Sequence, residues 1–252
     1  MFEKLDSARR IELAKAKMER VLDHFLYVLE LHANNAFVVY SPALSSEIPA
    51  SYAANAFNVF QKSMHQIEIV RLCALWDRTE SEKENIPTVI GLIDDDEIIR
   101  ILADETRQSF ANGNMPLLNP SDDPQLSAVE QQAVRDSEIQ FANEQASRAE
   151  ADLRETIRDT QAILASSRLA SVMNLRDKHL AHSLTTTRRE TRGPVAAMKY
   201  GDETAIIDLT CPIIERLFCW VNGKSFSIED SRRIDNKNAE ALWRNCRFDN
   251  IQ

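Results

Sequence analysis

Glycine and proline are scarce in this sequence. Its 252 residues include five glycines and eight prolines, which argues against a fold dominated by tight turns. Alanine, leucine, glutamate, arginine and glutamine are plentiful instead, and these residues favour helices. Hydrophobic residues make up 44% of the chain, enough for a sizeable core. The composition therefore predicts an all-α fold.

Long hydrophobic runs are absent as well. No apolar stretch approaches the roughly 20 residues that a membrane-spanning helix needs. Residues 1–6 contain no basic segment followed by an apolar run, which is the pattern of a secretory signal. We therefore expect a cytoplasmic protein that makes no membrane contact.

Cysteine occurs at four positions, Cys73, Cys211, Cys219 and Cys246. They are widely spaced, with no C-x-x-C pair and no histidine at zinc-finger spacing. We expect buried free thiols, and the sequence predicts neither a metal nor a cofactor.

An overall excess of positive charge is also lacking. The net charge is −9, which argues against broad, sequence-independent binding of nucleic acid. Residues 168–192 nevertheless hold six basic and two acidic residues, a local net charge of +4, so the rest of the chain carries −13. Such a basic segment can hold a phosphate group locally, or it can be a solvated loop whose arginines have no function.

Apolar residues recur every three or four positions along much of the chain, which is the pattern of amphipathic helices. The pattern predicts helices at residues 5–39, 51–78 and 86–93, and another that ends near residue 110. Asp95 or Asp96 is expected to cap the last of these. Arg71 interrupts the apolar stripe of the second helix, and we expect its charged end to reach the surface or to pair with an acid.

The middle of the chain is predicted to be a loop followed by a long helix. Residues 111–124 contain glycine, prolines and small polar residues, which indicates a loop or linker. A helix of residues 125–169 should follow. Its second half has a stripe of small residues that indicates pairing with a neighbouring helix or a second subunit, whereas the first half is expected to protrude or to be only partly packed.

The C-terminal part is less regular. Residues 196–202 are ambiguous between strand and coil. Thr210 followed by Pro212 predicts the start of a helix. Residues 222–252 are expected to form a C-terminal extension that contains a short helix at 236–246, with Trp243 packing on the body. The whole chain, residues 1–252, is predicted to be one helical domain.

Residues 175–183, with the sequence LRDKHLAHS, bring an arginine and two of the five histidines together. On an ideal α-helix, Arg176, His179 and His182 would share a face about 120° wide. An imidazole near its usual pKa of about 6.5 can move the protons of RNA phosphodiester cleavage without a metal, and an arginine can hold the phosphate. A zinc site at His179 and His182 is an alternative, although no cysteine or acid ligand stands nearby.

This segment resembles the arginine-polar-x(3 to 5)-histidine signature of the HEPN superfamily, and it is similar to the form found in AbiU-type abortive-infection proteins. The string Leu75, Trp76, Asp77 and Arg78 at the end of the second predicted helix is also like that of the family. The resemblance implies a HEPN-like helical bundle that forms a homodimer with the motif at the interface. It further implies an endoribonuclease of phage defence or of a toxin–antitoxin pair, which leaves cyclic phosphate and 5′-hydroxyl ends.

The same resemblance assigns roles to single residues. Arg176 would bind the phosphate, His182 would be the catalytic histidine, and Asp177 would orient them. Further substrate contacts are expected from nearby basic residues, namely Lys178, His179, Arg188 and Arg189. Leu184 stands where HEPN toxins that a partner nucleotidyltransferase modifies have a tyrosine, so we do not expect that mode of regulation.

A second hypothesis stays open beside the ribonuclease. Many HEPN-like proteins are noncatalytic helical modules, so the alternative to the ribonuclease is a module that binds RNA, a nucleotide or a protein partner. A protein antitoxin or regulator is a possible partner under both hypotheses. The placement of His182 discriminates between them, because burial against apolar side chains would favour a binding or structural role.

Overall fold

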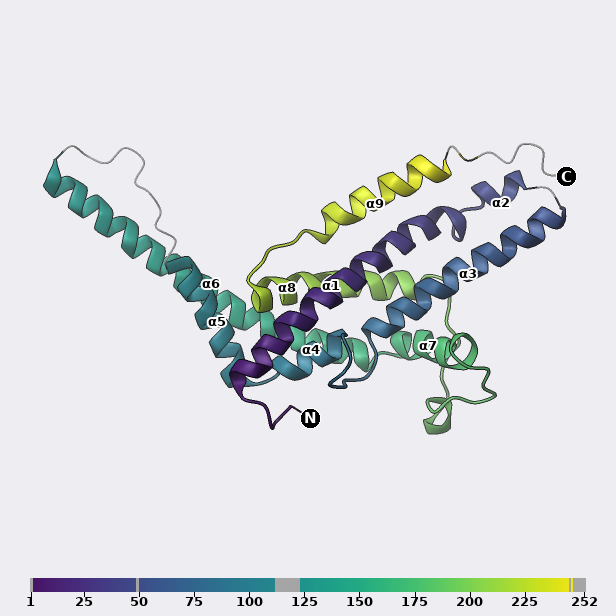
Figure 1. Ribbon diagram of the computed structural model, residues 1–252, viewed down its shortest axis with the longest axis horizontal. Coiled ribbons are helices and arrows are strands. Elements are labelled where there is room, and N and C mark those ends of the chain that lie inside the picture. Colours follow the sequence, from purple (N-terminus) through teal and green to yellow (C-terminus); the bar gives the residue numbers. More distant parts are fainter. Residues whose placement is uncertain (1, 49, 112–122, 245, 247–252) are drawn as a thin grey trace.

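The computed structural model describes residues 2–48, 50–111, 123–244 and 246. In these ranges it contains helices and no β-strand, which confirms the all-α prediction. Figure 1 shows the helices packed as an elongated bundle from which one long helix projects. The α-helices are α1 (Ser7–Val38), α2 (Ala43–Glu47), α3 (Tyr52–Leu75), α4 (Ile86–Ile93), α5 (Asp96–Ala111), α6 (Pro124–Leu164), α7 (Ser167–Leu175), α8 (Asp202–Asn222) and α9 (Ile228–Trp243).

Side-chain caps fix where several of these helices begin. The Asp6 carboxylate accepts a hydrogen bond from the Arg9 backbone N–H at 2.7 Å and so caps α1. Asp95 does the same for α5, because its Oδ1 accepts from the backbone N–H groups of Glu97 at 2.9 Å and Ile98 at 3.4 Å. The prediction that an aspartate caps this helix is therefore confirmed.

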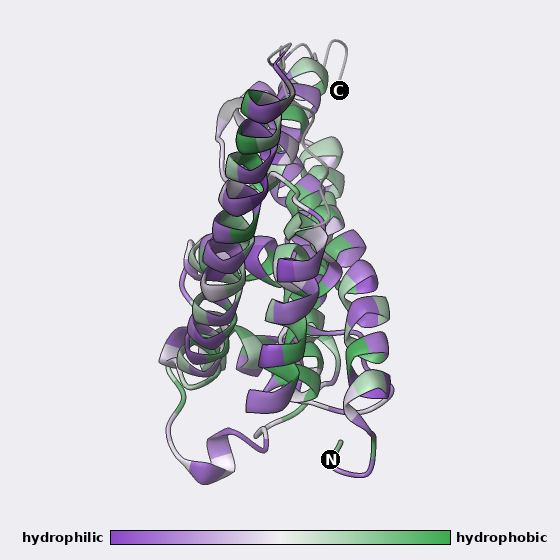
Figure 2. Ribbon diagram, turned by 90° about the vertical axis from the view of Figure 1, so that its left-hand side faces the viewer, coloured by the Kyte–Doolittle hydropathy of each residue, from purple (hydrophilic) through white to green (hydrophobic). Residues whose placement is uncertain are grey.

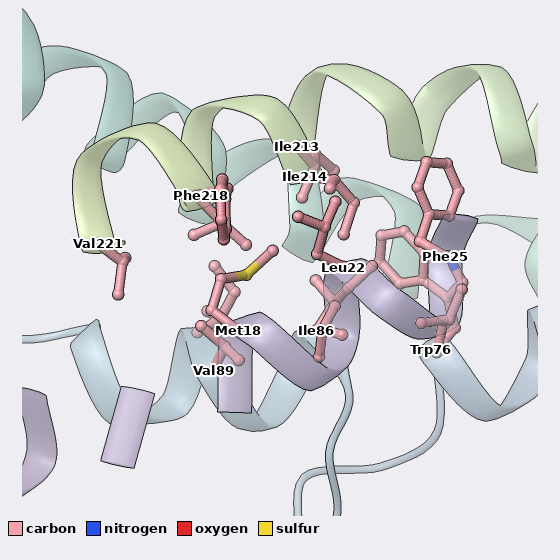
Figure 3. Close-up of a cluster of buried hydrophobic side chains, with 14 of the residues drawn as sticks. Met18, Leu22, Phe25, Trp76, Ile86, Val89, Ile213, Ile214, Phe218 and Val221 are labelled. Carbon is pink, nitrogen blue, oxygen red and sulfur yellow. The ribbon is translucent and has the colours of Figure 1, made fainter. Parts of the chain in front are cut away.

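One hydrophobic core joins the helices of the bundle. Figure 3 shows side chains of α1, α4 and α8 meeting there: Met18 and Leu22 come from α1, Val89 from α4, and Ile214 and Phe218 from α8. Figure 2 shows that the helices carry both hydrophobic and hydrophilic residues, as amphipathic helices around a shared core do. The periodicity of the sequence therefore predicted α1, α3 and α4 to within a few residues.

Arg71 lies on the surface of α3. Arg71 is exposed, and its guanidinium carbon lies 5.5 Å from the centroid of the Tyr27 ring. This is a cation–π contact at an exposed site. The prediction that the charged end of Arg71 reaches the surface is confirmed.

The long helix α6 projects from the body, with α5 alongside part of it (Figure 1). Its 41 residues span about 60 Å at 1.5 Å per residue. Most of its first half is exposed, as predicted, and Phe141 meets Phe110 of α5 edge to face with ring centroids 5.4 Å apart. Residues 112–122 of the predicted loop lie outside the described residues.

The predicted helix of residues 125–169 is in fact two helices. It is interrupted after Leu164, and the Ser166 hydroxyl accepts from the Leu169 backbone N–H at 3.1 Å to cap α7. The stripe of small residues in α6 packs inside the chain, because Ala142, Ala149 and Leu153 are fully buried. It is therefore not a surface for a second subunit.

The prediction that a helix starts at Thr210 and Pro212 is wrong. The helix α8 begins at Asp202, after coil at residues 196–200, and continues through Pro212. Thr210 is fully buried in its middle, where the hydroxyl donates to the Ile206 carbonyl at 2.6 Å and accepts from Trp76 Nε1 at 3.1 Å. Thr210 and Pro212 are a residue pair typical of helix starts, but here Thr210 makes a tertiary contact in the middle of a helix.

The C-terminal helix α9 begins earlier than predicted, at Ile228, because Ser227 caps it through the Asp230 backbone N–H at 3.2 Å. It packs along α1. Trp243 Nε1 donates to Asn34 Oδ1 at 2.8 Å, which confirms that this tryptophan packs on the body. Among the helices that the structure describes, none has both the length and the apolar composition needed to cross a lipid bilayer.

Candidate functional site

The motif lies where α7 changes into a wider helical turn. Residues Arg176–Leu180 form one turn of π-helix, in which the Ala181 N–H donates to the Arg176 carbonyl at 2.8 Å. The Leu184 N–H then donates to the Lys178 carbonyl at 3.0 Å and closes the end of the turn. π-Helical turns are rare and often occur at functional sites.

This turn corrects the predicted geometry of the motif. The regular α-helix ends at Leu175, so the ideal α-helical face that would unite Arg176, His179 and His182 does not exist. His182 lies beyond the last helical residue, and both histidines are exposed. The local sequence carries strong helix formers and gave no signal for the change from α to π.

Two carboxylates hold the Arg176 side chain, which is only 15% exposed. Its Nε and Nη2 donate to Oδ1 of Asp177 at 2.8 and 2.6 Å. Its Nη1 donates to Oδ1 of Asp77 at 3.1 Å. The guanidinium is therefore fixed from two sides, and Asp177 does contact the arginine that it was predicted to orient.

Asp77 is a site residue that sequence reasoning missed. It follows α3 directly and stands 99 positions before Arg176 in the chain. Lys83 Nζ also donates to it at 3.2 Å. The string of residues 75–78, which resembles that of AbiU-type proteins, was the available signal, but spacing in the sequence could not show which residue it would meet.

Glu190 ties the loop after the motif to α7 and to the π-turn. Lys178 Nζ donates to its Oε1 at 2.8 Å, Asn174 Nδ2 donates to the same oxygen at 3.1 Å, and the Thr187 backbone N–H donates to Oε2 at 2.9 Å. These hydrogen bonds, led by that of Lys178, lower the pKa of the Glu190 carboxyl to about 2. Neither Glu190 nor Thr187 was singled out from the sequence.

The structure brings together some of the predicted site residues. Arg189 Nε lies 3.7 Å from Asp177 Oδ2, so Arg189 belongs to the same charged group as Arg176. Lys178 faces Glu190 instead. Within the part of the chain that the structure describes, no hydrogen bond or ion pair joins His179, His182 or the side chain of Arg188 to this group.

Ion pairs reduce the charge of the basic segment. Arg168 pairs with Asp202 at 3.2 Å, in addition to the pairs of Arg176, Lys178 and Arg189. Arg188 and Arg192 form no ion pair among the described residues, and both are exposed. The free positive charge therefore lies in the exposed loop after the motif.

Cys73 lies one helical turn before Asp77 and is fully buried. Burial raises the pKa of its thiol to about 12, so the thiol stays neutral. The described cysteines form no disulfide bond, as predicted, but Cys211, Cys219 and Cys246 are only partly buried. In the described ranges, no group of three or more histidine, cysteine or acidic side chains is arranged to hold a metal ion.

A helical bundle with an arginine-polar-x4-histidine segment at the end of a buried helix is of the HEPN class. The model of one HEPN family, AbiU2, matches residues 14–242. This match covers nearly the whole chain, so the chain belongs to the AbiU2 family. Searches of curated proteins and of solved structures found no match.

Proposed function

We propose that this protein is a metal-independent endoribonuclease that acts in phage defence or in a toxin–antitoxin pair. The observation that carries the proposal is the Arg176 guanidinium, fixed by Asp177 and Asp77, in the same segment as an exposed His182 in a chain of the AbiU2 family. A guanidinium can donate two parallel hydrogen bonds to the oxygens of a phosphate. A histidine on the surface can be reached by an RNA strand.

The reaction needs no metal. The 2′-hydroxyl of RNA attacks the neighbouring phosphorus, and the bond from phosphorus to the 5′-oxygen breaks. In the proposed homodimer, one protomer's His182 takes the proton of the 2′-hydroxyl and the His182 of its partner gives a proton to the leaving 5′-oxygen. Arg176 stabilises the charge on the phosphate in the transition state. The products are a 2′,3′-cyclic phosphate and a 5′-hydroxyl.

Asp177 and Asp77 act as positioning residues in this mechanism. They occupy the donors of Arg176 in the structure, at 2.6 to 3.1 Å. A phosphate therefore has to share the guanidinium with them or replace one of them. Lys178, His179, Arg188 and Arg189 are proposed to contact the RNA backbone around the scissile phosphate, with the free charge of Arg188 the most available.

We further propose that the protein acts as a homodimer through α3. One face of this helix carries a stripe of exposed or half-buried small and apolar residues, which are Tyr52, Ala56, Val59, Ser63, Ile67, Val70 and Ala74. Their spacing of three and four residues is that of a helix that packs against another helix. The stripe runs toward the end of α3, where Asp77 meets Arg176, so a two-fold contact along it brings two sites toward each other.

The dimer is tested by introducing charge into this stripe. The double variant Val59→Asp and Ile67→Asp changes residues that are 65% and 43% exposed, so it should leave the protomer folded. We expect the mass measured by light scattering to fall from dimer to monomer, together with RNA cleavage. The control is Ile139→Asp, at a 53% exposed residue of α6. A monomeric wild type, or a double variant that stays dimeric, contradicts the proposed interface.

A noncatalytic binding module is the second candidate function. It is favoured by the net charge of −9 and by the ion pairs that occupy most basic residues of the motif segment. In this case the same face would hold RNA, a nucleotide or a protein partner such as an antitoxin without cleaving a bond.

An assay for cleavage of total RNA and transfer RNA in EDTA distinguishes the ribonuclease from the noncatalytic binding module. We expect wild type to cleave, and Arg176→Ala and His182→Ala each to lose activity by at least about a hundredfold. Arg216→Ala of α8 is the matched control, because Arg216 is also held by two carboxylates, those of Glu155 and Asp159 of α6. An intact wild-type dimer that degrades no RNA contradicts the ribonuclease and favours the binding module.

A further inference from the structure

A cavity of about 560 Å³ opens between the end of α1 and the start of α8. His32 of α1, Tyr40 just after it, and Tyr200 and Thr204 around the start of α8 line it. This volume is in the range of small-molecule sites. None of these residues belongs to the motif or to the residues that hold Arg176.

Four aromatic rings gather at this cavity. The Tyr40 ring lies 5.9 Å from the ring of His32, 5.9 Å from that of His65 and 6.3 Å from that of Tyr200, measured between centroids. The rings of His65 and Tyr200 stack at 5.5 Å with an angle of 4° between their planes. Tyr200 is 77% exposed, so it stands at the mouth of the cavity.

Two carboxylates lie behind these rings, and both are fully buried. Glu68 Oε1 accepts from His32 Nδ1 at 2.7 Å. Glu203 Oε1 accepts from the Tyr40 hydroxyl at 2.8 Å, and His65 Nε2 lies 3.4 Å from the same atom. Glu203 Oε2 has no hydrogen-bond partner among the described residues.

Histidines are the charged or chargeable groups that face the two carboxylates of this cluster. Across the described chain, no lysine or arginine forms an ion pair with Glu68 or Glu203. Burial by itself raises the pKa of the Glu203 carboxyl, but contacts with His65, its own backbone N–H and Tyr40 outweigh burial and lower the pKa to about 2, so this carboxyl is ionised. Its Oε2 is buried and accepts no hydrogen bond among the described residues, which is unfavourable for a carboxylate.

We propose that this cavity, lined by His32, Tyr40 and Tyr200 in front of Glu68 and Glu203, binds a small organic ammonium ion. Aromatic faces attract such cations through their quadrupoles, and alkylated ammonium groups are bound by clusters of aromatic rings. The two carboxylates add a negative field that a neutral ligand of the same shape cannot use. The proposed ribonuclease activity plays no part in this inference.

Isothermal titration calorimetry of the full chain tests the proposal with three probes. Choline supplies a quaternary ammonium, spermidine supplies primary and secondary amines, and 3,3-dimethyl-1-butanol is the neutral analogue of choline. We expect at least one cation to bind at one site per chain and the neutral analogue to bind at least about tenfold more weakly. Equal affinity for choline and its neutral analogue overturns the proposal, as does the absence of binding by both cations.

Two variants locate the site. Tyr200→Ala removes an exposed ring and should weaken cation binding roughly three- to tenfold without unfolding the protein. Glu203→Gln removes the charge and keeps the size, and should weaken binding by about tenfold or more. The control is Tyr27→Ala, at a tyrosine of α1 that contacts Arg71 and does not line the cavity. If Tyr200→Ala binds the cation as tightly as wild type does, the proposed site is wrong.

Discussion

The chain contains two clusters of charge that are built in opposite ways. At the motif, the cation Arg176 lies between Asp77 and Asp177, whose side chains are 28% and 29% exposed. At the meeting of α1, α3 and α8, the carboxylates of Glu68 and Glu203 are fully buried, and their charged or chargeable neighbours are histidines. The first cluster is a network of ion pairs near water, and the second is a pair of buried acids that face histidines.

This difference has consequences for both stability and function. Carboxylates that keep contact with water can leave Arg176 at low cost, so the motif can exchange one of them for a phosphate. Buried carboxylates cannot be hydrated in the folded state, so Glu68 and Glu203 must keep their donors. The first cluster is therefore suited to exchange with a substrate, and the second to a fixed network or a cationic ligand.

The largest effect on stability is expected at Glu68. The variant Glu68→Ala removes the buried carboxylate that accepts from His32 and Asn35, and Asn35 Nδ2 keeps only its hydrogen bond to the Met64 carbonyl at 3.3 Å. The free energy of unfolding should fall by about 3–5 kcal/mol, whereas Arg176→Ala should lower it by only about 1–2 kcal/mol, because Asp77 and Asp177 can then be hydrated. Urea denaturation of both variants measures these losses in the free energy of unfolding. Equal losses would contradict the difference between the two clusters.

A smaller effect is expected when the motif loses one of its two carboxylates. Asp77→Asn keeps the size of the side chain but weakens its hold on Arg176. If Asp77 only positions the guanidinium, kcat for RNA cleavage should fall roughly tenfold, and KM should not rise, because a negative charge near the phosphate is gone. Steady-state kinetics on a short RNA separates the two constants. A rise in KM with unchanged kcat would mean that Asp77 contributes to binding instead.

The smallest effect is expected in the dependence of stability on pH. Glu190 and Glu203 have folded-state pKa values of about 2, below the value of 4.5 for an unperturbed glutamate. Both therefore stabilise the fold above about pH 4.5, and this stabilisation is lost as the pH falls toward 2. Glu190→Gln should reduce the fall in the free energy of unfolding between pH 4.5 and pH 3, as measured by urea denaturation at pH 7, 4.5 and 3. The control, Glu240→Gln on the exposed surface of α9, should keep the wild-type slope.

Much of the fold followed from the sequence because its signals are local. The apolar period predicted α1, α3 and α4 to within a few residues, and Asp95 caps α5 as expected. The failure at Thr210 has a physical reason, since its hydroxyl is used by Trp76, a residue 134 positions away. A short segment has the same cap-like sequence whether or not such a distant contact exists.

The candidate site was predicted only in part, for the same reason. The sequence placed Arg176, Asp177 and His182 in one segment, and the structure joins the first two. The role of Asp77 depends on how α3 packs near α7 and the π-turn, which periodicity does not specify. The cluster of Glu68 and Glu203 was missed because its members come from three helices with no common motif.

The chemistry of the RNA ends is the direct test of metal-independent RNA cleavage by His182. Fragments produced by wild type in EDTA should be analysed by mass spectrometry beside those from His182→Ala. We expect 2′,3′-cyclic phosphate and 5′-hydroxyl ends from wild type and no fragments from the variant. Ends with a 5′-phosphate, or equal cleavage by His182→Ala, would contradict this expectation.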